Sequence, residues 1–61
     1  MNIDELITRL EAEHDDWRMH AAGEKLSGNV VKEAHYMGTA TGLRIAIGII
    51  IEERLKEEAK G

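Results

Sequence analysis

The segment from Val30 to about Lys60 would be apolar on two opposite sides of a helix, and this feature constrains the fold more than any other. At about 100° per residue, one side collects Val31, Ala34, Gly38, Gly42, Ile45 and Ile49. The opposite side collects Tyr36, Ala40, Leu43, Ile47, Ile50 and Ile51. One neighbouring helix can cover only one of these sides. The other must meet a further chain or stay exposed as an apolar patch.

The centre of this segment is also compatible with a strand, because the run Ile45–Ile51 is rich in β-branched residues. The run continues without a breaker into a stretch where Glu52 and Lys56 have the i,i+4 spacing that supports a helix. A lone strand would also have no mate. We therefore predict a helix over residues 30–59, with a strand at its centre as the alternative.

Another helix is predicted over residues 3–22. Asn2, followed three residues later by Glu5, has the spacing of an N-terminal capping box. One mostly apolar stripe then recurs at three- and four-residue steps: Ile3, Ile7, Leu10, His14, Trp17 and Ala21. Residues 23–29 have the composition of a turn. The predicted fold class is all-α, a single domain over residues 1–61 in which two helices form a hairpin.

The chain has 61 residues and no cysteine, so it can form neither disulfides nor thiolate zinc sites. So small a domain is only marginally stable alone. We therefore expect an obligate homo-oligomer, a dimer in the first instance, in which two hairpins form a four-helix bundle. The face assigned to the oligomer interface is Tyr36, Ala40, Leu43, Ile47, Ile50 and Ile51. The residues assigned to close helix packing are Ala34, Gly38, Gly42 and Ile45, because small side chains let another helix approach.

The net charge of −4 argues against nucleic-acid binding, which requires a basic surface. The acidic N-terminus lacks the basic start of a signal peptide. The most apolar run, residues 43–51, is interrupted by Arg44 and is shorter than the roughly 20 residues that span a bilayer. We expect a cytoplasmic protein without a membrane partner.

Candidate chemistry is sparse. Glu11 and His14 have the Glu-x-x-His spacing seen in di-iron bundles, but residues 43–51 supply no matching carboxylate. They remain weak metal candidates, and no cofactor is expected. Trp17, Arg44 and His35 are candidate contacts for a ligand or partner. The sequence contains no recognisable phosphate loop or nucleophile motif, so we expect no enzymatic activity.

The second helix resembles the C-terminal helix of small accessory proteins encoded by bacteriophages and prophages. The residues that carry this resemblance are Tyr36, Gly38, Gly42, Leu43, Ala46, Ile49, Ile50, Glu52 and Glu53. It implies a short, acidic, oligomeric product that binds a host protein.

The sequence therefore predicts a non-enzymatic homo-oligomeric module that binds protein. The resemblance implies that it is a phage-encoded inhibitor of a host or defence protein. The alternative is a binder of a nucleotide, another anion or a metal at the oligomer interface.

Overall fold

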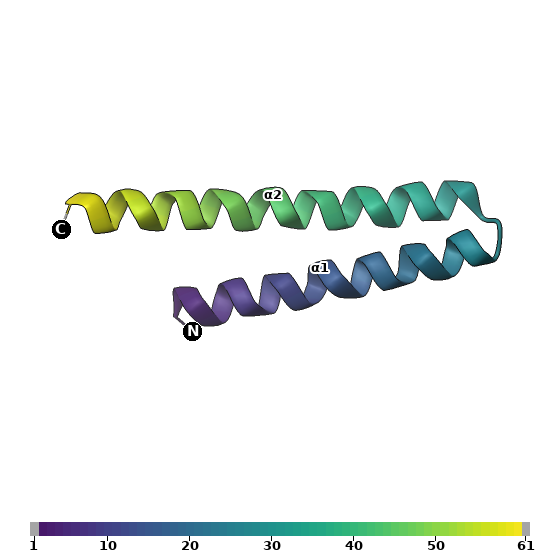
Figure 1. The fold of residues 1–61 in the computed structure, drawn as a ribbon, viewed down its shortest axis with the longest axis horizontal. Helices are drawn as coiled ribbons and strands as arrows, with labels where there is room; N and C mark the ends of the chain where they lie inside the picture. The colour runs from purple at the N-terminus through teal and green to yellow at the C-terminus, as the bar shows by residue number, and fades with distance from the viewer. Residues whose placement is uncertain (1, 61) are drawn as a thin grey trace.

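The computed structural model describes residues 2–60, which form two α-helices and no strand. Helix α1 covers Ile3–Leu26 and helix α2 covers Val30–Lys60. They run antiparallel and side by side in an elongated body (Figure 1) with extents of 50 × 17 × 12 Å. The predicted all-α hairpin is confirmed, and the β-branched run in the middle of α2 is helical rather than a strand.

The start of α1 is capped as its sequence predicts. The side chain of Asn2 accepts a hydrogen bond from the backbone N–H of Glu5 at 2.8 Å, and the Asn2 amide donates to the Glu5 carboxylate at 3.4 Å. Asp4 and Glu5 lie in the first turn, where the positive end of the helix dipole favours carboxylates.

The end of α1 lies four residues beyond its predicted position, because the helix continues through Gly23 to Leu26. It is Gly28, with a φ of 77°, that ends the helix. Gly28 N–H donates to the carbonyl of Lys25 at 3.1 Å, and Asn29 N–H donates to that of Glu24 at 2.9 Å. This pair of bonds is a Schellman motif. The turn therefore occupies residues 27–29 rather than 23–29.

Asn29 also starts α2, since its side-chain oxygen accepts from the backbone N–H of Lys32 at 3.1 Å. One residue thus closes the first helix and caps the second. Three residues therefore connect the two helices.

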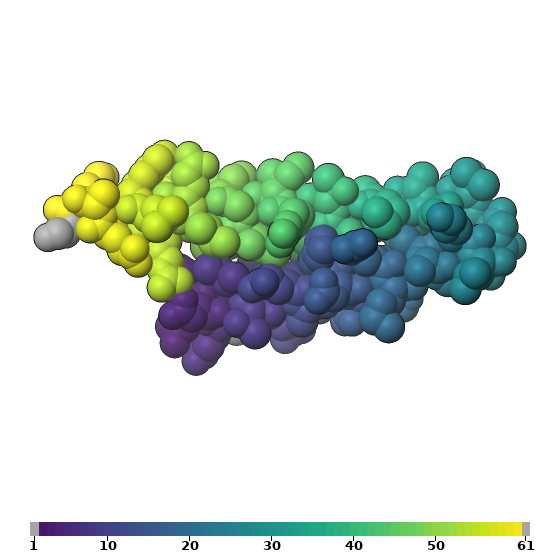
Figure 2. All heavy atoms as spheres, viewed as in Figure 1, coloured from purple at the N-terminus to yellow at the C-terminus, as the bar shows by residue number. Residues whose placement is uncertain are grey.

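The core of the hairpin is thin. Among the described residues only Ala21, Ala40 and Ile47 are buried, at 2%, 1% and 3% exposure. α1 has 24 residues and α2 has 31, so the extra seven residues make α2 about 10 Å longer. The space-filling view shows this C-terminal end projecting past the start of α1 (Figure 2).

Candidate functional site

The two apolar sides of α2 have different environments. We call Tyr36, Ala40, Leu43, Ile47 and Ile50 the inner face, because they are buried or half-buried against α1. The two smallest residues of the interface, Ala21 on α1 and Ala40 on α2, are also its two least exposed. They permit a close approach of the two helices.

The sequence prediction assigned the residues of the inner face to an interface between chains. Within residues 2–60, Ala40 and Ile47 are already covered by α1 of the same chain. Ile51, the sixth residue of that prediction, is 40% exposed and lies at the open end of the hairpin.

The opposite side of α2 has no neighbour among residues 2–60. We call it the outer face, and its ten uncharged residues span roughly 140° of the helix circumference: Val30, Val31, Ala34, Met37, Gly38, Thr41, Gly42, Ile45, Gly48 and Ile49. All ten are exposed, with Val31 at 80%, Ile45 at 59% and Ile49 at 56%. The face runs for about 29 Å without a charge.

The residues predicted to pack closely against another helix, Ala34, Gly38, Gly42 and Ile45, are exposed in the single hairpin, so the structure of one chain does not test that prediction. A Cβ atom added to Gly38 or Gly42 would meet no other atom within 4 Å. The glycines therefore expose bare helix backbone to solvent, and nothing in a single hairpin compensates for their cost to helix stability of about 1 kcal/mol each.

An aromatic cluster lies in the half of the hairpin nearer the turn. The ring centroids of Trp17 and Tyr36 are 5.4 Å apart, and His20 lies 5.6 Å from Trp17 and 6.0 Å from Tyr36. His35 continues the cluster at 5.7 Å from Tyr36. Trp17 and Tyr36 are half-buried, so the predicted contact residue Trp17 joins the two helices. The sequence spacing places His20 beside Trp17, but it gave no sign of the Trp17–Tyr36 contact across the turn.

The weak metal candidates are not assembled into a site. His14 Nδ1 lies 3.1 Å from a carboxylate oxygen of its neighbour Asp15, and Glu11 lines a notch nearer the N-terminus. Within residues 2–60 there is no group of three His, Asp or Glu side chains placed to hold a metal ion. Arg44 is exposed on the border between the inner and outer faces.

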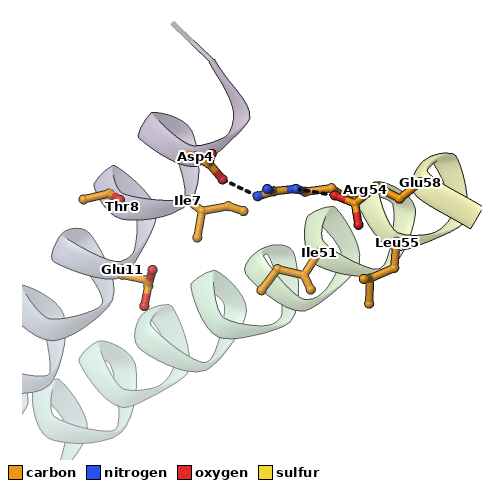
Figure 3. Close-up of a pocket in the computed structure, with 8 residues that line it drawn as sticks. All are labelled: Asp4, Ile7, Thr8, Glu11, Ile51, Arg54, Leu55 and Glu58. Atoms are coloured by element: carbon orange, nitrogen blue, oxygen red, sulfur yellow. Dashed lines mark hydrogen bonds and ion pairs between the residues drawn. The ribbon is translucent and has the colours of Figure 1, made fainter. Parts of the chain in front are cut away.

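The notch at the open end of the hairpin was not predicted. It has a volume of about 470 Å³ and is formed where α2 continues past the start of α1 (Figure 3). Its lining combines apolar and charged side chains: Asp4, Ile7, Thr8, Glu11, Ile51, Arg54, Leu55 and Glu58.

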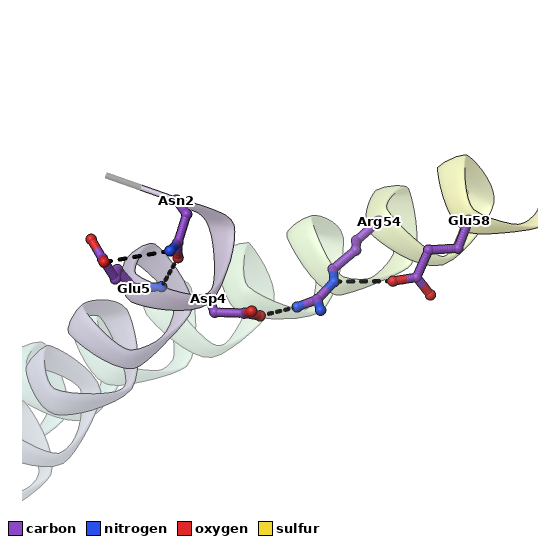
Figure 4. A network of polar contacts seen from close by, with 5 residues as sticks. All are labelled: Asn2, Asp4, Glu5, Arg54 and Glu58. Carbon is purple, nitrogen blue, oxygen red and sulfur yellow. Dashed lines mark hydrogen bonds and ion pairs between the residues drawn. The ribbon is translucent and has the colours of Figure 1, made fainter. Parts of the chain in front are cut away.

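Arg54 connects the helices across this notch. Its guanidinium donates to the carboxylate of Asp4 and, at 3.3 Å, to that of Glu58 (Figure 4). The hydrogen bond and negative charge of Asp4, followed by those of Glu58, raise the pKa of Arg54. Because both carboxylates already match its charge, Arg54 is poorly suited to hold a further anion. Pairing the residues that lie at equal distances before and after the turn would have placed Asp4 near residues 52–54.

By length and composition α2 is apolar enough to cross a membrane, with a mean hydropathy of 1.2 over its most apolar window. Only 11% of that window is buried in the hairpin. The window is mostly exposed because it includes residues of the outer face.

No family model matches the chain, and no curated protein or solved structure has significant similarity to it.

Proposed function

We propose that this chain is a non-enzymatic, self-associating helical module that acts by binding protein. The observation that carries the proposal is the outer face of α2, ten uncharged and exposed residues in an unbroken row. An amphipathic helix of a monomer carries charged or polar residues on the side away from its core. An apolar row of this length is characteristic of a surface that another chain covers.

Sedimentation velocity over a wide range of protein concentrations tests self-association. We expect the sedimentation coefficient to rise from that of a hairpin to that of a dimer as the concentration increases. A species with the mass of one chain at every concentration would refute the proposal.

We further propose that the assembled module inhibits a host protein with a basic surface. Support comes from the resemblance of α2 to phage accessory proteins and from the net charge of −4 of the chain. Residues 52–60 are all exposed, and Glu52, Glu53, Glu57 and Glu58 there form ion pairs with Arg54, Lys56 and Lys60 of the same helix.

Capture from host lysate tests this second proposal, with a matched variant in which the four glutamates become glutamine. Glutamine keeps the helix propensity and removes the charge. We expect the wild type to retain a basic protein that the variant loses, in a salt-sensitive manner. Equal capture by both chains would contradict it.

The alternative function, binding of a nucleotide or another anion, depends on Arg44, the basic residue beside the outer face. Thermal-shift screening against nucleotides and divalent metals separates the two functions. A saturable shift that Arg44→Ala abolishes would favour the anion-binding alternative.

A further inference from the structure

We infer that the outer face of α2 is the contact surface for a second copy of this chain, and that the two α2 helices pack antiparallel with their crossing point near Ala40. The inference rests on the proposed self-association and specifies its surface and direction. Figure 1 shows α1 along one side of α2 and nothing along the other.

The exposed surface area of one chain supports a second copy as the partner. The chain exposes 4722 Å², whereas a compact folded monomer of 6.8 kDa would expose about 4000 Å². The excess is roughly 700 Å². Each partner in a stable protein–protein interface buries about 800 Å². A contact between the outer faces of two chains, burying an area of that size on each chain, would remove the excess.

The order of side chains along the outer face supports an antiparallel pair. Counted from Ala40, Val31 lies nine residues before and Ile49 nine residues after, while Gly38 and Gly42 lie two residues before and after. A two-fold axis at this point places Val31 against Ile49 and Gly38 against Gly42 of the partner, the reciprocal pairing that an isologous interface requires. The branched side chains then meet at the two ends of the contact, and the glycines meet at its centre.

The glycines acquire a function in this arrangement. In one hairpin, a Cβ atom at Gly38 or Gly42 would have only open space around it. At the crossing point of two helices, the missing side chains let the backbones approach closely and let the flanking branched side chains interlock. The cost of each glycine to the helix is then offset at the interface.

Charge favours the antiparallel direction. A parallel pair would bring the two copies of Glu52 and Glu53 to the same end of the assembly. An antiparallel pair centred at Ala40 separates the two copies of Glu52 by about 36 Å, several Debye lengths at physiological salt.

Charge also favours a second copy over a lipid surface. Helices that lie on membranes carry lysine and arginine on their polar side and are attracted to anionic lipids. Here the chain has a net charge of −4, and Glu33 and His35 accompany Arg44 beside the outer face. An acidic chain of this kind is repelled by an anionic bilayer.

The resulting dimer differs from the predicted four-helix bundle. Because the inner and outer faces lie on opposite sides of α2, the four helices form one layer with the two α2 helices in the middle. The surface of α1 that would then face solvent is mostly polar, which suits an outer helix: Glu5, Thr8, Arg9, Ala12, Asp15 and Asp16.

Cysteine crosslinking tests the inference, since the chain has no cysteine of its own. Val31→Cys and Ile49→Cys are prepared separately, one of them with a mass tag, and then mixed, equilibrated and oxidised. Both positions are exposed in the hairpin, so neither change disturbs its fold. In the antiparallel dimer, Val31 of one chain lies beside Ile49 of the other, whereas two copies of Val31 are about 27 Å apart. Ala12→Cys, on the outer surface of α1, is the control.

We expect the product of intermediate mass, V31C joined to I49C, to predominate, with little homodisulfide of either variant and none of A12C. Homodisulfides of V31C and I49C would overturn the antiparallel direction and leave self-association intact. A dimer by sedimentation with no crosslink at either position would overturn the choice of surface. A monomer that instead cosedimented with phosphatidylcholine vesicles would overturn both this inference and the proposed self-association.

Discussion

The inner and outer faces of α2 are both apolar, but only one is used within the chain. The inner face places Ala40 against α1 and surrounds it with larger side chains, and Ile47 is 3% exposed there. The outer face places glycines at its centre, and its Ile49 is 56% exposed. The comparison teaches that apolarity identifies a face that needs covering but does not show what covers it.

The largest expected difference between the faces comes from placing a charge on each. Ile47→Asp puts a carboxylate between α1 and α2 and removes a buried side chain whose loss alone costs about 2–5 kcal/mol. We expect the helical circular dichroism signal to disappear at every protein concentration. Ile49→Asp puts the same charge on the outer face, where a single hairpin leaves it in water. We expect this variant to stay helical and to sediment as a monomer.

An equal loss of helix in both variants would contradict the distinction between the inner and outer faces. It would mean that the hairpin cannot fold without its partner and that the two faces belong to one cooperative core. A dimeric Ile49→Asp variant would contradict the role of the outer face.

A leucine at Gly42 tests the outer face by size. A Cβ atom at Gly42 would meet no other side chain or helix within 4 Å in the hairpin, and leucine improves helix propensity by roughly 1 kcal/mol. We therefore expect unchanged or greater helicity together with at least about a tenfold weaker self-association, equivalent to about 1.4 kcal/mol, measured by sedimentation. Gly23→Leu adds the same bulk to the exposed surface of α1 and should leave association unchanged. Equal association of the two variants would count against close packing at Gly42.

The turn is expected to have a smaller effect, although it determines which side of α2 faces α1. Gly28→Ala forces a Cβ atom into the left-handed region, at a cost of about 1–2 kcal/mol. Urea unfolding should show a loss of that size, whereas Ser27→Ala, an exposed position in the same turn, should change stability by less than about 0.5 kcal/mol. A Gly28→Ala variant as stable as Ser27→Ala would show that the Schellman motif does not hold the hairpin together.

The smallest effect is expected at the open end. Asp4→Asn removes the charge that pairs with Arg54, but Asp4 is 72% exposed and Arg54 is 41% exposed. Pairs of this kind contribute little to stability. We expect the thermal midpoint of the variant to match the wild type, and the wild-type midpoint to change little with added salt. A clear loss of stability at low salt only would show that the notch is more rigid than its exposure suggests.

Much of the fold was predictable from local rules. The capping box at Asn2, the continuous helix through residues 45–51 and the pair Glu52–Lys56, here 3.5 Å apart, all depend on neighbours within four residues. The end of α1 was missed because Gly23 was taken as the stop, although Gly28 followed by the capping residue Asn29 is the stronger signal.

The sequence did not show which of the two apolar faces of α2 meets α1, for a different reason. The rule that small residues mark close packing is correct here, but it applies at Ala21 and Ala40 within the hairpin and leaves Gly38 and Gly42 outside. Which side of α2 meets α1 depends on the rotation that the turn imposes. The spacing of apolar residues within one helix gives no information about that rotation. The Asp4–Arg54 contact, across 50 residues of sequence, was missed for the same reason.

The three-residue turn also determines the order in which the hairpin can form. Contacts nearest the turn close the shortest loops, and each contact farther along encloses a longer one at only a gradually rising entropic cost. Such local topologies fold on the microsecond-to-millisecond timescale, and we expect closure to proceed from Gly28 toward Asp4. Hydrogen exchange in α1 should therefore be slowest around Ala21 and fastest in its first turns. The notch at the open end is the last part of the molecule to assemble and the first to open.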